Sequence, residues 1–208
     1  MKAYLRQGGG SGKSSIATIL TEKGWKIGSD DLLIVDNSGF AYSYPKKAQI
    51  YAYNLVGNKI LKRKVYDSLP LQRKIIWKMR EKILGNKQVR RRVSLGMVGD
   101  KIDYKPIKIK YVLDLRRTNQ PESSVEKINA EDLAATHSHI LNYEFRDYLN
   151  HRLYLETFTP DRNIVNSSFT QTRKVIEQAL KNTEIYRINV PKKSTPKDMI
   201  KFIDSIIN

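Results

Sequence analysis

The chain has 208 residues, 40% of them hydrophobic and 28% charged, a balance typical of a globular protein rather than a disordered one. Its lack of cysteine excludes disulfides, thiolate metal sites and a cysteine nucleophile. No apolar run approaches the roughly 20 residues needed to cross a bilayer, and residues 1–6 are too short and polar for a signal peptide. We therefore expect one domain over residues 1–208, cytoplasmic and without a membrane partner.

The charge is unevenly distributed. There are 38 Lys and Arg residues against 21 Asp and Glu residues, a formal net charge of +17. Residues 59–92 hold 13 basic residues and two acidic ones, Asp67 and Glu81, a net +11. Such a cluster predicts an anionic partner, with nucleic acid among the candidates; the alternative is a solvated basic surface.

The N-terminal part is predicted to mix strands and helices. A strand is expected over residues 3–6, then a helix over 14–23 that Gly24 ends. Further strands are expected at 25–28, 31–36, 40–44 and 47–54, the middle two forming a hairpin about Asn37-Ser38-Gly39.

A strongly periodic helix is predicted next, with Ser68 as its cap, Pro70 in its first turn and Gly85 at its end. Its apolar stripe is expected to pack inward behind a basic outer face: Leu71, Ile75, Ile76, Met79 and Ile83. The remaining predicted elements are a strand over 107–115, a helix entered at 129–132, a helix over 170–180, a strand over 184–190 and a helix from 195. Together they predict an α/β fold with a mixed sheet.

A glycine-rich loop joins the first strand to the first helix: Gly8, Gly9, Gly10, Ser11, Gly12, Lys13, Ser14 and Ser15. Glycines let a backbone wrap closely around phosphates, and the helix N-terminus adds partial positive charge. Lys13 would then reach the β- and γ-phosphates, and the Ser14 hydroxyl would coordinate Mg²⁺. Gln7 stands where the strict pattern has glycine, and a Gly/Ser linker is the alternative interpretation. The loop predicts binding of a nucleoside triphosphate, with ATP and Mg²⁺ as the expected ligands.

Two adjacent carboxylates, Asp30 and Asp31, follow soon after this loop. One could orient the magnesium shell while the other takes a proton from an incoming hydroxyl. A polar turn that opens the hairpin is the alternative. Beside the loop, the pair favours phosphotransfer.

The glycine loop, its helix, the step Lys23-Gly24-Trp25 and the acidic pair entering a strand resemble HPr kinase/phosphorylase, in the small form that lacks the N-terminal domain. The close similarity covers residues 7 to 45. That family shares its nucleotide-binding core with the ATP-dependent phosphoenolpyruvate carboxykinases, so the resemblance implies a single P-loop domain with a mixed sheet. It also implies a kinase that transfers the γ-phosphate of ATP to a hydroxyl of a protein, peptide or small metabolite. Asp30 would be the proton acceptor, and Asp31 would lie with Ser14 near the metal or position Asp30, although the reverse order of the two aspartates stays open. Lys13 would serve the phosphates.

Three basic residues are candidates for a phosphate or substrate contact: Arg90, Arg91 and Arg92. A solvated surface is the alternative. Four tyrosines near basic residues could stack nucleic-acid bases or be half-buried strand residues: Tyr42, Tyr44, Tyr51 and Tyr53. His137 and His139 are expected at the surface. Two alternative functions stay open: a kinase whose acceptor is RNA, and a nucleotide-gated nucleic-acid-binding protein with little catalysis.

Overall fold

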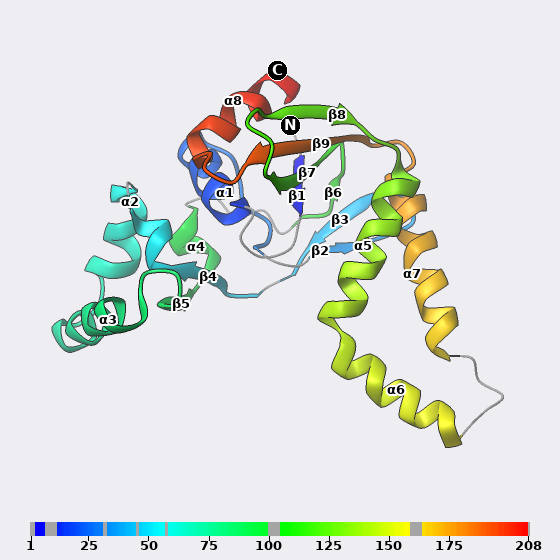
Figure 1. Cartoon of the computed structure of the whole chain (residues 1–208), viewed down its shortest axis with the longest axis horizontal. Coiled ribbons are helices and arrows are strands. Elements are labelled where there is room, and N and C mark those ends of the chain that lie inside the picture. Colours follow the sequence, from blue (N-terminus) through cyan, green and yellow to red (C-terminus); the bar gives the residue numbers. More distant parts are fainter. Residues whose placement is uncertain are drawn as a thin grey trace.

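The computed structural model describes residues 3–6, 12–30, 33–44, 46–56, 58–99, 105–158 and 164–207. Within them the chain forms a mixed α/β structure with eight α-helices and three small β-sheets (Figure 1). Residues 7–11 of the glycine loop and Asp31 lie outside the described residues. None of the helices in the described ranges combines the length and apolar composition that a membrane span requires.

The largest sheet is built from strands far apart in sequence, in the order β1 (Ala3–Arg6), β7 (Tyr111–Thr118), β9 (Glu184–Pro191) and β8 (Ser124–Lys127). The first three strands run parallel, and β8 is antiparallel to β9. This arrangement confirms the predicted strands over 3–6 and 184–190. The strand predicted over 107–115 is divided into β6 (Ile107–Lys108) and β7.

Helices cover both faces of this sheet. Because side chains alternate along a strand, Leu113 and Leu115 of β7 face one side and Val112 the other. The first side packs on α1 (Lys13–Glu22) and α8 (Pro196–Ile207), and the second on α5 (Ala130–Glu144) and α7 (Ile164–Leu180). Strands β7 and β9 are therefore covered on both sides, whereas β8 is exposed.

The predicted hairpin forms between β2 (Leu33–Val35) and β3 (Phe40–Ser43), which with β6 make the second sheet. The Asp36 carboxylate closes the turn by accepting N–H groups of Ser38 and Phe40, each at 2.9 Å. Gly39 adopts φ 79°, a left-handed conformation that suits glycine.

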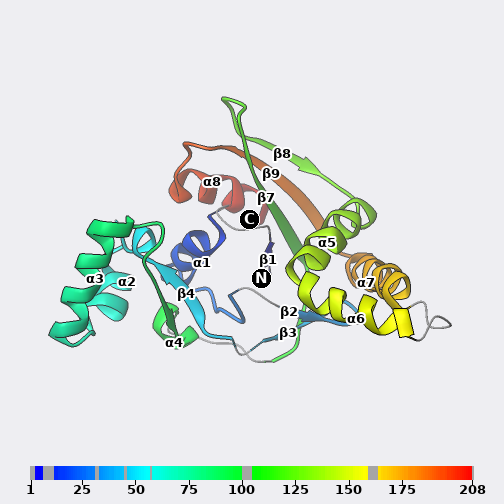
Figure 2. The same cartoon turned by 60° about the horizontal axis from the view of Figure 1, so that its bottom comes forward.

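A separate group of elements lies beside α1 in Figures 1 and 2. It contains β4 (Ala48–Tyr51), the 3₁₀ helix η1 (Ala52–Leu55), α2 (Lys59–Lys62), the π-helical η2 (Arg63–Asp67), α3 (Leu71–Leu84), β5 (Arg90–Val93) and α4 (Leu95–Val98). The group has a core of its own, in which Ile50, Val65 and Trp77 are buried together. The strand predicted over 47–54 ends at Tyr51 because the chain turns into η1 there.

On the other side of the molecule, α5 continues into α6 (Arg146–Phe158), and α7 returns beside α5 (Figure 1). The predicted start of α5 is confirmed, since Asn129 Oδ1 accepts the N–H of Asp132 at 2.7 Å. His139 is exposed as expected, but His137 is buried, so its surface prediction is wrong. His137 lies beside Leu133 and Ala134 on the inward face of α5.

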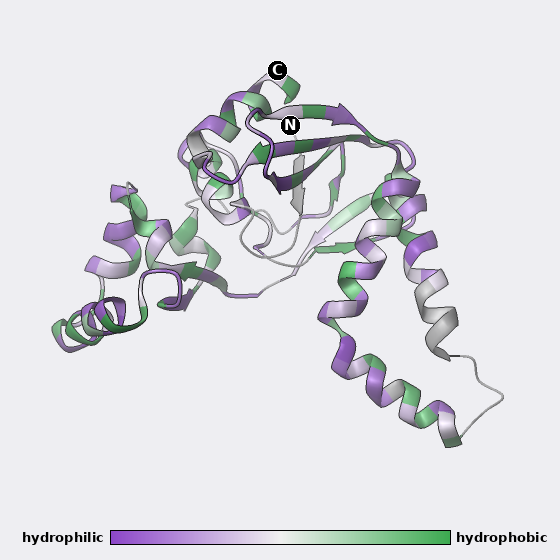
Figure 3. Cartoon of the chain, in the orientation of Figure 1, coloured by the Kyte–Doolittle hydropathy of each residue, from purple (hydrophilic) through white to green (hydrophobic). Residues whose placement is uncertain are grey.

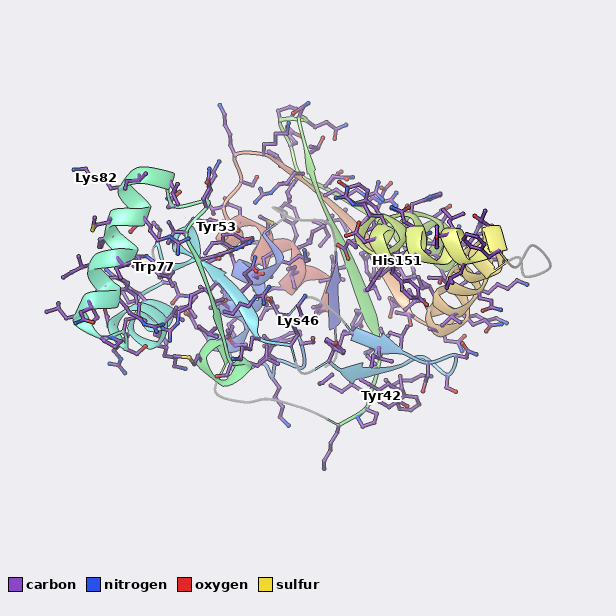
Figure 4. The ribbon with its side chains drawn as sticks, turned by 90° about the horizontal axis from the view of Figure 1, so that it is seen from below. Tyr42, Lys46, Tyr53, Trp77, Lys82 and His151 are labelled. Carbon is purple, nitrogen blue, oxygen red and sulfur yellow. The ribbon has the colours of Figure 1, made fainter. Side chains whose placement is uncertain are left out.

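The orientation of α3 differs most from expectation. The helix ends at Gly85 as predicted, but Pro70 rather than Ser68 precedes its first residue, and the Ser68 hydroxyl bonds back to the carbonyl of Lys64. The apolar stripe faces outward: Leu71 is 74% exposed and Ile83 75%, whereas Trp77 is only 8% exposed. The helix packs through Trp77, whose ring lies edge-on to that of Tyr66 with the ring centroids 6.2 Å apart. Trp77 points into the protein (Figure 4).

Residues 25–28 form no full strand. Only Ile27 makes an isolated bridge, and its side chain is buried in the core beneath β4 and α4. The segment leads the chain from α1 to Asp30.

Candidate phosphate-binding site

The first turn of α1 begins at Gly12, which has φ 98°. Its carbonyl accepts the N–H of Ile16 at 3.0 Å, and Lys13 is the first helical residue. A Cβ at position 12 would lie 3.1 Å from Met199 Cε and 3.3 Å from Arg117 Nη2. The left-handed backbone conformation therefore favours glycine where the predicted loop enters its helix, and a Cβ there would also press on Met199 and Arg117.

Two of the predicted site residues are brought together across the chain. Ser14 Oγ donates a hydrogen bond to Asp30 Oδ1 at 3.3 Å. The other carboxylate oxygen, Oδ2, accepts the backbone N–H of Gln49 at 3.0 Å. Asp30 is thus held between the first turn of α1 and strand β4, and one of its oxygens faces the predicted magnesium ligand.

The neighbouring hydroxyl is held in a similar way. Asn54 Nδ2 donates to Ser15 Oγ at 2.9 Å, and Asn54 Oδ1 accepts the backbone N–H of Tyr51 at the same distance. Asn54 is buried, and the oxygen and the nitrogen of its side-chain amide each have a hydrogen-bond partner within the protein.

One edge of β4 supports both contacts. Along an antiparallel strand, successive N–H groups point to opposite edges. The N–H of Ala52 points toward the β5 side, where it donates to Val89 O at 2.8 Å, and those of Gln49 and Tyr51 point away from it, to Asp30 and Asn54. The edge of β4 that is not paired with β5 therefore holds Asp30 and Asn54, the side chains that contact Ser14 and Ser15.

A further cation lies next to Gly12. Arg117 comes from the carboxyl end of β7, and its Nη1 donates to the carbonyls of Pro191 and Ser194, both at 2.9 Å. Its Nη2 lies next to Gly12, since a Cβ added to that glycine would be 3.3 Å from this nitrogen. Burial lowers the pKa of Arg117, but a guanidinium keeps its charge in proteins.

Three residues of the site were not predicted from the sequence: Arg117, Asn54 and Gln49. Ligands of parallel α/β sheets bind beyond the carboxyl ends of the strands, a rule that could have selected Arg117 at the end of a predicted strand. No comparable signal marks Asn54 or Gln49.

The three consecutive arginines lie on β5, on the side of β4 away from Asp30. Arg91 Nη1 donates to the carbonyl of Val65 at 2.7 Å, and Arg90 Nη1 contacts the hydroxyl of Tyr51 at 3.3 Å. Arg92 is paired in register with Gln49. These contacts of Arg90 and Arg91 are within their own group of elements rather than with α1.

The tyrosines separate into two places (Figure 4). Tyr51 and Tyr53 stack with ring centroids 5.3 Å apart, and burial together with the neighbouring Tyr51 raises the pKa of Tyr53. Tyr42 instead lies on the β2–β3 hairpin, where its hydroxyl donates to Asp36 Oδ2 at 2.8 Å, which raises its pKa. Tyr44 is exposed just after that hairpin, and its carbonyl accepts from Ser29 Oγ at 3.1 Å.

Oxygen donors of the kind that magnesium uses lie at the start of α1. No group of three or more His, Cys, Asp or Glu side chains within the described part of the chain could hold a metal ion. Mg²⁺ favours oxygen ligands and is commonly held by one or two protein groups together with water and substrate phosphates. The hydroxyl of Ser14 and the carboxylate of Asp30 are such a pair.

No family model matches the chain, and comparisons with curated proteins and with solved structures gave no match either.

Proposed function

We propose that the protein is an ATP- and Mg²⁺-dependent kinase that transfers the γ-phosphate to a hydroxyl acceptor, a serine of a protein or peptide or a small metabolite. The observation that carries this proposal is the hydrogen bond from Ser14 Oγ to Asp30 Oδ1 at the N-terminus of α1. A hydroxyl and a carboxylate paired at a helix start behind a glycine loop are the groups that phosphate and magnesium binding need.

The surroundings of α1 support a polyphosphate rather than a neutral ligand. The ten-residue helix presents its N-terminus, with Lys13 in the first position, near the carboxyl ends of parallel strands. Arg117 adds a second cation beside Gly12, and it is held by the carbonyls of Pro191 and Ser194. A helix N-terminus and two cations together favour dense negative charge.

We assign Asp30 and Asp31 the reverse of the roles that the resemblance to HPr kinase/phosphorylase implies. Both oxygens of Asp30 accept hydrogen bonds, and one of these comes from the Ser14 hydroxyl. This arrangement supports Asp30 as the group that orients the magnesium shell. Asp31, the adjacent residue, is then the proposed proton acceptor.

The reaction balances with these groups alone. The acceptor hydroxyl gives its proton to the Asp31 carboxylate while its oxygen bonds to the γ-phosphorus. The bond from that phosphorus to the β–γ bridging oxygen breaks, and ADP leaves. Mg²⁺, when bound, would neutralise phosphate charge, and Lys13 would stabilise the charge on the transferring group.

RNA is a second candidate acceptor. It is favoured by the stacked pair Tyr51 and Tyr53, with the Arg90 guanidinium 6.0 Å from the Tyr51 ring centroid. Aromatic pairs beside cations hold single-stranded bases. Arg90, Arg91 and Arg92 remain proposed substrate contacts in either case.

The test is transfer of labelled γ-phosphate from ATP to free serine, to peptide mixtures and to total RNA. Lys13→Ala should abolish transfer to whichever acceptor works. Higher magnesium should partly restore transfer by Asp30→Asn if Asp30 orients the metal, and should not restore Asp31→Asn. The kinase proposal fails if Lys13→Ala and both aspartate variants transfer phosphate like the unaltered protein. Labelling of RNA alone would identify the second acceptor class.

A further inference from the structure

Helix α3 exposes a continuous row of aliphatic side chains. Leu71, Ile75, Met79 and Ile83 recur every four residues on one side of the helix, with Ile76 beside them. All five are more than half exposed, while Trp77 on the opposite side is buried. An isolated exposed apolar residue is ordinary, but a row this long on one helix marks a binding surface.

Basic residues border this row on both sides. At 3.6 residues per turn, Lys78 and Lys82 fall along one border and Arg73 and Arg80 along the other. Lys82 points away from the body of the protein, whereas Trp77 points into it (Figure 4). Lys78 also approaches Glu81 at 3.6 Å, but its side chain stays largely exposed. The mixture of apolar and charged residues along α3 is visible in Figure 3.

The position and charge of α3 restrict what can cover it. The helix lies at one end of the molecule, far from α6 at the other end (Figures 1 and 2). Residues 59–92 carry a net +11, so a second copy would bring like charge against like. Nucleic acid would contact the basic residues but would leave the aliphatic row exposed to water. An anionic surface with an apolar interior satisfies both sets of side chains.

We infer that α3 binds an anionic lipid bilayer surface. The aliphatic row enters the boundary between headgroups and acyl chains, and Arg73, Arg80 and Lys82 extend to the lipid phosphates. The helix lies in the plane of the interface and does not cross it. This inference does not depend on the proposed kinase activity, because α3 is not part of the site at α1.

The test is co-sedimentation of the whole protein with vesicles of phosphatidylcholine mixed with phosphatidylserine, and with vesicles of phosphatidylcholine alone. The unaltered protein should bind the mixed vesicles at least tenfold more tightly than the neutral ones. Changing Ile75 and Met79 together to Glu should lower binding to the mixed vesicles by at least tenfold. Leu153→Glu on α6 is the matched control, because Leu153 is 50% exposed and Ile75 is 52% exposed, and it should leave binding unchanged.

Thermal unfolding of each variant verifies that these surface changes leave the fold intact. A milder pair, Ile75→Ser with Met79→Ser, should weaken binding in the same direction. The inference is wrong if the Glu pair binds mixed vesicles as the unaltered protein does, since the apolar row would then be unused. It is also wrong if the protein does not bind vesicles and instead forms a dimer that the double change of Ile75 and Met79 to Glu dissociates. A second copy would then cover α3.

Discussion

Ser14 and Asp30 are joined through the serine hydroxyl, which lies 3.3 Å from Asp30 Oδ1 across 16 residues of chain. The backbone of Gln49 holds the other oxygen of Asp30. The carboxylate therefore has a fixed orientation toward the first turn of α1. Preorganised oxygen donors of this kind lose little freedom when a cation arrives.

Ser14→Ala should therefore weaken ATP binding chiefly when magnesium is present. The variant loses a proposed metal ligand and leaves Asp30 without its hydroxyl partner, so we expect a roughly 10- to 100-fold loss of Mg²⁺-dependent affinity. Calorimetric titration with ATP, with and without magnesium, measures this. An equal loss in both conditions would assign Ser14 to phosphate contact or to folding instead.

Asn54 should stabilise the start of α1 through Ser15. Replacing Asn54 with Ala leaves the N–H of Tyr51 and the hydroxyl of Ser15 without this partner, at a cost of about 1–3 kcal/mol in free energy of unfolding. A double-mutant cycle with Ser15→Ala, followed by urea unfolding, should give a coupling energy of about 0.5–3 kcal/mol. Strict additivity of the two changes would show that the contact contributes nothing.

Gly12 and Gly24 form a matched pair of positions. They have similar φ values of 98° and 91°, but a Cβ would meet Met199 and Arg117 at Gly12 and open space at Gly24. Gly24→Ala should cost only the backbone strain of about 1–2 kcal/mol. Gly12→Ala should cost more and should also weaken ATP binding. Similar losses of stability and no effect of either variant on ATP would contradict the close approach at Gly12.

Asp36 should make stability depend on acid pH. Hydrogen bonds from the N–H of Phe40 and the hydroxyl of Tyr42 lower the pKa of its carboxyl below the unfolded value of about 3.9. A lowered folded-state pKa means that the unfolded state binds more protons. The stabilisation is therefore present above the unfolded pKa and is lost as the pH falls through the folded one. Urea unfolding at several pH values should show Asp36→Asn less stable near neutrality, with the difference closing in acid. A difference that stays constant with pH would rule out this contribution.

Local patterns in the sequence predicted much of the fold. The hairpin at Asn37-Ser38-Gly39, the cap at Asn129 and the end of α3 at Gly85 are confirmed, since each depends on residues close together in the chain. The short elements α2, α4 and β5 were not predicted, because their positions depend on packing in a core that joins distant segments.

The outward face of α3 could not be predicted from periodicity. An apolar stripe indicates which residues share a side of a helix but not which side meets the protein. Here the packed side is the one that carries Trp77, the buried residue of the helix. The exposed stripe is instead available to a partner.

The site was predicted in part. Motif spacing selected Lys13, Ser14 and Asp30 together, and the structure brings Ser14 and Asp30 into contact. Motif spacing could not select Gln49 or Asn54. Gln49 acts through its backbone N–H, which every residue except proline has, and no sequence motif identifies a buried asparagine. Gly8, Gly9, Gly10, Ser11 and Asp31 remain predictions, since they lie outside the described residues.

The central claim is that Asp30 serves phosphotransfer from ATP. The most direct measurement is the initial rate of γ-phosphate transfer to the acceptor class that the unaltered protein labels, compared among that protein, Asp30→Asn and Asp36→Asn. Asp36 is a control carboxylate of the same type on the β2–β3 turn, outside the site. We predict that Asp30→Asn, which removes a carboxylate from the proposed magnesium shell, lowers the rate roughly 10- to 100-fold, while Asp36→Asn leaves it unchanged. Equal rates for all three proteins would contradict the assignment of Asp30 to phosphotransfer.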